Sequence, residues 1–118
     1  MGQENAESTG TRQLSGIGGQ MDFLEGAYRS KGGKGFICIN SSRVTKDGER
    51  KSNILATIPG GSTISAPRTM IQYVATEYGI ASLSGKTLRE RAEAMAAIAH
   101  PDFRDELTFE AKKRGIMI

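Results

Sequence analysis

The stretch that decides the fold is MIQYVATEYG, residues 70–79, an apolar run that ends in a carboxylate, an aromatic residue and a glycine. A short apolar run bounded by turn residues is typical of a buried β-strand, so a strand is predicted over Met70–Ala75. Glu77 follows the carboxyl end of that strand, which is where α/β folds build their sites. From the residues alone, an ordinary polar residue that ends a strand is the simpler interpretation of Glu77.

Two further strands are expected on the amino-terminal side of this run. Residues 35–40 read as a buried strand because their apolar side chains do not alternate with polar ones, and Cys38 within it is expected to be a small buried hydrophobe. Another apolar run, residues 54–58, is stopped by a Pro-Gly-Gly sequence. Between them, residues 43–53 form a charged stretch around Asp47-Gly48, which is a turn signal.

The carboxyl-terminal third is helical in pattern. Thr87 and Glu90 fit a capping box, which predicts a helix over residues 88–99. The apolar residues at helical spacing in this segment are Leu88, Ala92, Met95, Ala96 and Ala99. Pro101 interrupts the pattern, and a second helix is expected over residues 102–114, with Gly115 as its cap. The residues expected on one side of this second helix are Phe103, Leu107 and Ala111.

A shorter helix is expected over residues 21–28, with Phe23, Leu24 and Ala27 facing inward. Strands followed by helices indicate an α/β layer structure, and 118 residues suit one domain. Three strands and two good helices make a thin core, which would leave apolar strands uncovered. The pattern therefore predicts part of a larger sheet.

Composition excludes several classes of function. The 16 basic and 13 acidic side chains are interleaved and give a net charge of only +3, and aromatic residues are 6% of the chain with no Trp. A nucleic-acid interface would need clustered Lys/Arg and stacking aromatics, so none is expected. No apolar run approaches the ~18–20 residues that cross a bilayer, and Met1–Thr11 contains no apolar leader segment. A cytoplasmic protein without membrane contact is therefore expected.

The single cysteine and the single histidine offer little chemistry of their own. Cys38 cannot form an internal disulfide, and no base-bearing motif accompanies it. His100 lies between the two predicted helices, where a hydrogen-bonding role at the junction is favoured over that of a general base. No Cys or His partners accompany it at the spacing of a metal site, so no metal is expected.

Four stretches, taken in order, resemble one known family. They are SGIGGQMDF at 15–23, SKGGK at 30–34, YVATEYGIA at 73–81, and GKTLRERA at 85–92 continuing to IAHPDFR at 98–104. Together they resemble the C-terminal part of the acetyl-CoA hydrolase/transferase family, whose members include butyryl-CoA:acetate and 4-hydroxybutyrate CoA-transferases. The resemblance implies that residues 1–118 are the C-terminal portion of a three-layer α/β/α domain that ends in two helices.

The resemblance also implies a reaction. In the family a glutamate attacks the acyl-CoA thioester, and the resulting glutamyl-CoA passes coenzyme A to a second carboxylate such as acetate. That glutamate lies upstream of the SGIGGQ loop in a stretch this chain does not contain, so the isolated chain is expected to be inactive. Coenzyme A is a substrate and no permanent cofactor is implied. The expected partners are an acyl-CoA, a short-chain carboxylate, and either an N-terminal half or further copies of the chain.

Two other functions stay open. The first is a hydrolase, in which water instead of a carboxylate resolves the glutamyl-CoA. The second is a non-catalytic module that only completes a partner's sheet.

The resemblance assigns candidate site residues. The loop residues Gly18, Gly19 and Gln20 are expected at coenzyme A, with the amide of Gly19 facing the developing oxyanion. A plain glycine turn is the competing interpretation of this loop. Glu77 matches a second active-site glutamate that positions the nucleophile or tunes its charge.

Two stretches depart from the family pattern. The later one is Ser52-Asn53-Ile54-Leu55-Ala56, where relatives have Ser-Arg-Ile-Val-Pro, and the earlier one bears on coenzyme A. Where relatives often have Pro-Ser-Thr-x-Lys, this chain has Asn40-Ser41-Ser42-Arg43-Val44. The lysine that contacts coenzyme A is thus replaced by Val44, and Arg43 or Lys46 is expected to substitute for it. An arginine is not a simple replacement for a lysine at a phosphate, so affinity for coenzyme A is the property this departure affects.

Overall fold

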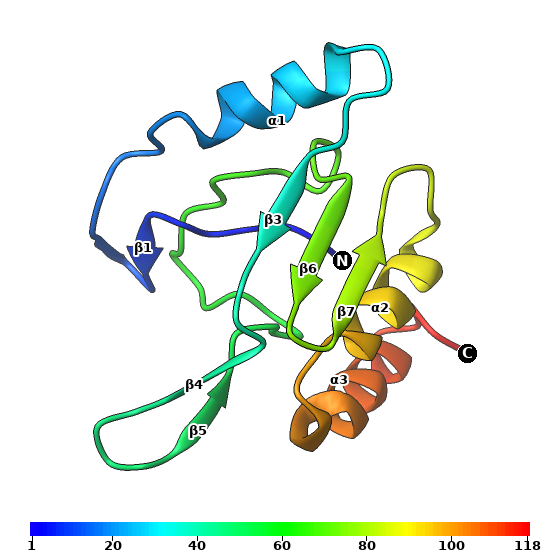
Figure 1. Ribbon diagram of the computed structural model, residues 1–118. Coiled ribbons are helices and arrows are strands. Elements are labelled where there is room, and N and C mark those ends of the chain that lie inside the picture. Colours follow the sequence, from blue (N-terminus) through cyan, green and yellow to red (C-terminus); the bar gives the residue numbers. More distant parts are fainter.

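The computed structural model describes all residues from Met1 to Ile118 as a mixed α/β structure with three helices (Figure 1). The confirmed fold class is therefore α/β. The strands are β1 (Ser8–Thr9), β2 (Arg12–Gln13), β3 (Phe36–Cys38), β4 (Ser42–Val44), β5 (Arg50–Ser52), β6 (Tyr73–Thr76) and β7 (Gly79–Ser82). The helices are α1 (Gln20–Arg29), α2 (Leu88–Ala97) and α3 (Pro101–Lys113). None of the three helices combines the length and the apolar composition that crossing a membrane requires.

The central sheet has the strand order β3-β6-β7, in which β3 runs parallel to β6 and β7 runs antiparallel to it. The strand predicted over Met70–Ala75 is confirmed as β6, although it begins at Tyr73. The strand β7 was not predicted, because it starts with Gly79 at φ 141° and its four residues mix small, apolar and polar side chains. Two short hairpins, β1–β2 and β4–β5, lie outside this sheet.

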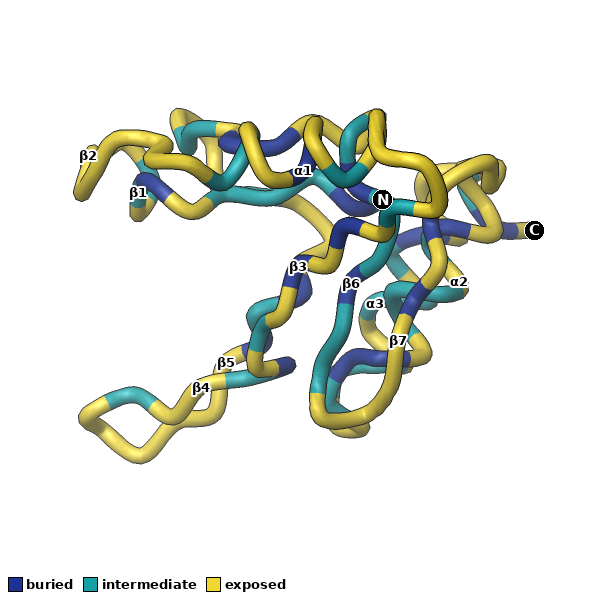
Figure 2. Tube along the Cα trace, turned by 45° about the horizontal axis from the view of Figure 1, so that its top comes forward, coloured by how far each residue is buried: buried dark blue, intermediate teal, exposed yellow.

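Only one face of the central sheet is covered. Ile37, Val74 and Ala81 lie opposite one another in register and are all buried. They belong to a core that α1, the segment between β5 and β6, and the residues that follow β7 and α2 complete. The further core residues are Leu24, Ile54, Ala66, Ile71, Leu83, Ile98 and Ala99. On the other face, Phe36 is 44% exposed and Ile80 is 63% exposed (Figure 2). The predicted thin core with uncovered strand surface is thus observed, and the three-layer arrangement stays a prediction.

The alternation of burial along β3 corrects two expectations. Ile37 is buried whereas Phe36 and Cys38 are exposed, so the strand is not buried on both sides and Cys38 is not a buried hydrophobe. In α1, Leu24 is buried and Ala27 is partly buried, but Phe23 is 82% exposed and does not face inward. The strand and the helix both form where they were predicted, but each has more apolar side chains than the core of this chain buries.

The region between β3 and β6 differs most from the expectation. Residues 54–58 form no strand: Ile54 is buried but Leu55 is 47% exposed, and the segment is irregular. The charged stretch before it forms the hairpin β4–β5 instead, closed by Gly48 at φ 82° with its N–H bonded to the carbonyl of Thr45 at 2.9 Å. The turn signal at Asp47-Gly48 is therefore confirmed. The hairpin itself was not predicted, because its strands have no alternating apolar residues that would indicate a β-structure.

The carboxyl-terminal helices are close to the prediction. The capping box is present, with Glu90 N–H donating to the Thr87 hydroxyl at 3.3 Å and Thr87 N–H donating to the Glu90 carboxylate at 2.8 Å. The N-cap of α3 is His100, whose Nδ1 accepts a hydrogen bond from Asp102 N–H, which confirms its role at the helix junction. Gly115, at φ 66°, follows the end of α3. Leu88 is 43% exposed, so the apolar stripe of α2 is narrower than predicted.

Candidate functional site

The carboxylate of Glu77 lies at the carboxyl end of β6 and is held by the end of the neighbouring parallel strand. The Ser41 hydroxyl donates to Glu77 Oε1 at 2.6 Å, and the Ser41 N–H donates to Oε2 at 2.9 Å. Ser41 is fully buried, whereas Glu77 is exposed. Because β3 and β6 are parallel, the loops that follow them emerge at the same edge, which brings these residues together across 36 positions of sequence.

The two hydrogen bonds from Ser41 stabilise the ionised form of Glu77. The Ser41 hydroxyl first, and then the Ser41 N–H, hold the pKa of Glu77 below its ordinary value, with a smaller contribution from the positive form of His100. Hydrogen bonds to a carboxylate favour its ionised form. A carboxylate with a lowered pKa is a poor proton donor near neutral pH, so this geometry suits a fixed negative charge and hydrogen-bond acceptor better than a general acid.

The same hydrogen-bonded edge carries the base of the β4–β5 hairpin. Asn53 N–H donates to the Ser41 carbonyl at 2.9 Å, and the Asn53 side chain donates to the Asn40 carbonyl at 2.9 Å. Arg43 in turn donates from Nη1 to Asn53 Oδ1 at 2.6 Å. Glu77, Ser41, Asn53 and Arg43 therefore form one connected network, which joins the carboxylate to the first basic residue of the hairpin.

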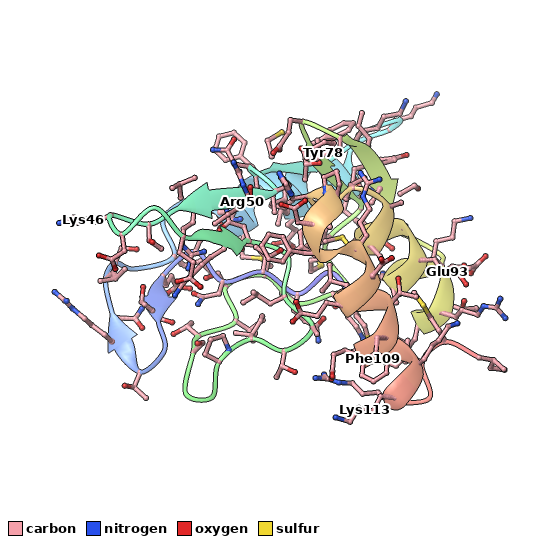
Figure 3. All side chains as sticks on the ribbon, turned by 90° about the horizontal axis from the view of Figure 1, so that it is seen from below. Lys46, Arg50, Tyr78, Glu93, Phe109 and Lys113 are labelled. Carbon is pink, nitrogen blue, oxygen red and sulfur yellow. The ribbon has the colours of Figure 1, made fainter.

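The second predicted basic residue lies farther out. Lys46 is exposed in the turn of the hairpin, and no carboxylate pairs with it. Figure 3 shows Lys46 at the outer end of the hairpin, on the opposite side of the view from Glu93 of α2. Arg43 faces Lys51 across the two strands, so the hairpin presents two positive side chains on one face.

The predicted glycine loop leads into α1. Gly18 has φ 61°, a conformation that favours glycine, and Gly19 is the N-cap residue of α1 without a side-chain cap. No hydrogen bond in the structure uses the N–H of Gly18 or Gly19 as its donor. The Gln20 side chain is less available, because its Nε2 donates to Glu4 Oε2 at 3.0 Å. Burial raises the pKa of Glu4, and the Gln20 hydrogen bond opposes that shift.

The structure does not bring the glycine loop and Glu77 into contact. A Cβ placed on Gly19 would have only Phe23 and Asp22 as neighbours within 4 Å. The surroundings of Glu77 come instead from β3 and the α2–α3 junction: Tyr78 packs edge-on against His100, and Arg104 lies 5.3 Å from the Tyr78 ring centre. The candidate residues thus form two separate groups within this chain.

An open cavity of about 350 Å³ lies at the strand ends beside Glu77. It is lined by Cys38, Ile39, Asn40, Ala75 and Thr76, the last residues of the parallel pair and the loop after it. No three carboxylate, histidine or cysteine side chains gather closely enough to hold a metal ion.

Two residues of this edge were missed by the sequence analysis, Ser41 and Asn53. Both lie in stretches that the analysis treated as departures from the family pattern, without a role for either side chain. The available signal was a hydroxyl, Ser41, directly after the strand predicted over 35–40, and a carboxylate, Glu77, two residues after the strand predicted over 70–75. Loops that follow parallel neighbouring strands meet at one edge of a sheet.

The fold and this edge define a segment of an α/β protein whose candidate site is a buttressed carboxylate at the carboxyl end of parallel strands. The chain belongs to the acetyl-CoA hydrolase/transferase family, because the profile of the acetyl-CoA hydrolase/transferase C-terminal domain matches residues 1–111. The resemblance noted from the four stretches is therefore confirmed.

Individual relatives agree with this family. The butyryl-CoA:acetate CoA-transferase of Anaerostipes caccae is 49% identical over 98% of this chain, and the 4-hydroxybutyrate coenzyme A transferase of Clostridium kluyveri is 49% identical over 97%. In each pair the match spans 26% of the relative. The crystal structure of RipA from Yersinia pestis matches with a TM-score of 0.82 and 42% identity, over 96% of this chain and 24% of that one. The chain thus spans about a quarter of the length of the relatives it matches.

Proposed function

We propose that this chain is the C-terminal segment of a CoA-transferase that moves coenzyme A from a short-chain acyl-CoA to a carboxylate such as acetate. Acetyl-, butyryl- and 4-hydroxybutyryl-CoA are the proposed donors, and a glutamyl-CoA thioester is the proposed intermediate. The observation that carries the proposal is the family match over residues 1–111, supported by relatives whose names specify butyryl-CoA, acetate and 4-hydroxybutyrate. Coenzyme A is a substrate in this proposal, and no resident cofactor is required.

The proposed role of Glu77 follows from its hydrogen bonds. Ser41 occupies both carboxylate oxygens and favours the ionised form. We propose that the negative charge of Glu77 lies near the upstream nucleophilic glutamate. A second negative charge raises the pKa of a nearby carboxyl group, which makes its carboxylate a stronger nucleophile. Ser41 is the positioning residue that fixes the Glu77 side chain at this edge.

The proposed coenzyme A contacts come from both groups of candidate residues. The N–H groups of Gly18 and Gly19 are unbonded and exposed, which supports an oxyanion role for Gly19. Arg43 and Lys46 supply the positive charge for the phosphates of coenzyme A, with Arg43 the better placed because the network through Asn53 ties it to Glu77. Gln20 would first have to leave Glu4.

The missing nucleophile and the open sheet face support a partner. Phe36 stacks on Tyr73 at 4.8 Å between ring centres, on the uncovered face that also carries Cys38 and Ile80. We propose that the N-terminal part of the enzyme covers this face and supplies the glutamate. If the chain acts only as a module, the same face would dock a partner without turnover.

The test is a chimera in which this chain replaces the C-terminal quarter of the Anaerostipes caccae transferase. With butyryl-CoA and acetate, the chimera should form acetyl-CoA, whereas the isolated chain should show no exchange above buffer. Release of free coenzyme A without acetate would identify a hydrolase. An inactive but folded chimera would favour the non-catalytic module.

Substitutions in the chimera test the site residues. Gly19→Val keeps the N–H, but its side chain should block the approach of the carbonyl oxygen to it. The rate should then fall by on the order of 10²–10³, the usual effect of losing one oxyanion donor. Glu77→Gln should change the pH–rate profile as well as the rate, because it removes a charge beside the nucleophile. Glu93→Gln, on the exposed side of α2, is the matched control and should leave both unchanged. Folded Gly19 and Glu77 variants with wild-type rates at every pH would refute the assignment.

A further inference from the structure

The buried residue of α2 is charged. Arg91 is only 8% exposed, and its one side-chain hydrogen bond runs from Nη1 to the Met1 carbonyl at 3.2 Å. Three more exposed arginines, Arg29, Arg89 and Arg114, each pair with a glutamate on their own helix, but no carboxylate lies within ion-pair distance of Arg91. The one buried arginine of the chain therefore has no carboxylate partner.

Burial of this kind is costly unless it is compensated. A guanidinium has five N–H donors, and the Met1 carbonyl accepts from only one of them. The Arg91 nitrogens without a partner keep some contact with solvent, so they are open to a further acceptor. A buried charge is normally paired, because removal from water destabilises the charged form. The nearest charges make the balance worse, since burial and the neighbouring Arg68 both lower the pKa of Arg91. Burial, Arg91 and Arg68 likewise lower the pKa of the Met1 amino group.

The backbone explains why these groups meet. Glu4 and Ala66 form an isolated antiparallel bridge, so the residues before Glu4 run past the residues that follow Ala66. Gly2 has φ 104°, and a Cβ there would lie 2.7 Å from Leu83 Cδ1 and 3.3 Å from Arg91 Nη1. Figures 1 and 2 both show the amino terminus beside β6 and β7. Any residue joined to Met1 would therefore begin within reach of the Arg91 guanidinium.

We propose that Arg91, assisted by Arg68, is a carboxylate-binding site whose occupant is an acidic side chain from a segment leading into residue 1. The proposal rests on the proposed function in one respect, namely that this chain works joined to or beside an upstream part. A carboxylate matches the planar fork of a guanidinium in two parallel hydrogen bonds. Such a pair would satisfy Arg91 and fix the incoming segment against α2 and β7.

The test measures thermal unfolding of the 118-residue chain with short amino-terminal extensions. Gly/Ser extensions carry one Asp at the first, second or third position before residue 1, and each has a partner with Asn at that position. At least one Asp extension should raise the unfolding midpoint by several degrees over its Asn partner. The difference should vanish with Arg91→Gln and shrink with Arg68→Gln, but persist with Arg89→Gln, the matched control on the same helix.

Each outcome decides the proposal. Arg91→Lys retains the positive charge without the planar guanidinium, and it replaces Arg91→Gln in the test if that variant does not fold. It should reduce the difference in unfolding midpoint between the Asp and Asn extensions. A parallel titration replaces chloride by acetate at constant ionic strength. Saturable stabilisation by acetate that depends on Arg91, with no effect of any extension, would overturn the upstream occupant in favour of a free carboxylate.

No response to either would overturn the site altogether. Unfolding needs no turnover, so an inactive chimera would count against the proposed function and not against this pair.

Discussion

The turn between α1 and β3 gives a sharp test of the fold, because it sets the direction of the helix that carries the glycine loop. Gly33 donates its N–H to the Ser30 carbonyl at 2.9 Å, and a Cβ on Gly33 would lie 2.0 Å from the Ala27 carbonyl oxygen. Real Cβ contacts are essentially never shorter than 3.0 Å, so Gly33→Ala must displace backbone by about 1 Å. Forced overpacking of this kind costs roughly 1–3 kcal/mol.

The measurement is thermal unfolding followed by circular dichroism. In a chain of this size we expect the Gly33→Ala midpoint to fall by roughly 5–15 °C. The matched control is Gly26→Ala in α1, where an added Cβ meets nothing within 4 Å. It should stabilise the chain by about 0.5–1 kcal/mol, because glycine weakens a helix relative to alanine. A Gly33→Ala midpoint equal to wild type, or both variants shifting in the same direction, would refute this geometry.

Three further predictions concern Glu77, the helix cap and the core. Ser41→Ala should raise the pKa of Glu77 in an NMR titration of the carboxyl carbon. The lowered pKa of Glu77 in the folded state stabilises the wild-type fold above the unfolded-state pKa, and this stabilisation is lost as the pH falls through the folded-state pKa. The free energy of unfolding of the variant should therefore fall less over this pH range than that of wild type. An unmoved titration midpoint would show that Ser41 does not hold the carboxylate. Thr87→Ala should lower the free energy of unfolding by about 1 kcal/mol, because the capping box of α2 is lost. Leu83→Ala, at a fully buried position, should cost about 2–5 kcal/mol, whereas Phe109→Ala, at a side chain 65% exposed, should lie within about 0.5 kcal/mol of wild type in denaturant unfolding.

The elements that the sequence predicted correctly are those whose signals are local. The capping box at Thr87 and Glu90, the break at Pro101 and the apolar run before Glu77 each act within a few residues, so pattern and structure agree. The hairpin β4–β5 was missed because an exposed two-stranded ribbon needs no apolar face. The failed strand at residues 54–58 shows the converse, since an apolar run can be buried as an irregular segment.

The candidate site was predictable only in part for the same reason. Glu77 could be singled out from its place after a strand and from the family resemblance. Its partner Ser41 is 36 residues away, and the contact depends on the parallel pairing of β3 with β6, which no local pattern specifies. Arg91 could not be recognised as buried, because the apolar residues around it are at helical spacing and predict leucine, methionine and alanine side chains on the buried side of α2.

The separation of the glycine loop from Glu77 gives the predicted inactivity of the isolated chain a second physical basis. Catalysis of thioester attack requires the oxyanion donor and the groups around the nucleophile to lie within hydrogen-bond distance of one reacting centre. A Cβ placed on Gly19 would meet only Phe23 and Asp22 of α1 within 4 Å, while Glu77 is tied to Ser41 and the hairpin. A reacting centre that touches both groups must therefore be bounded on one side by atoms this chain does not supply. The proposed N-terminal part would then do more than contribute a nucleophile: it would also complete the walls of the site between the two groups of proposed site residues.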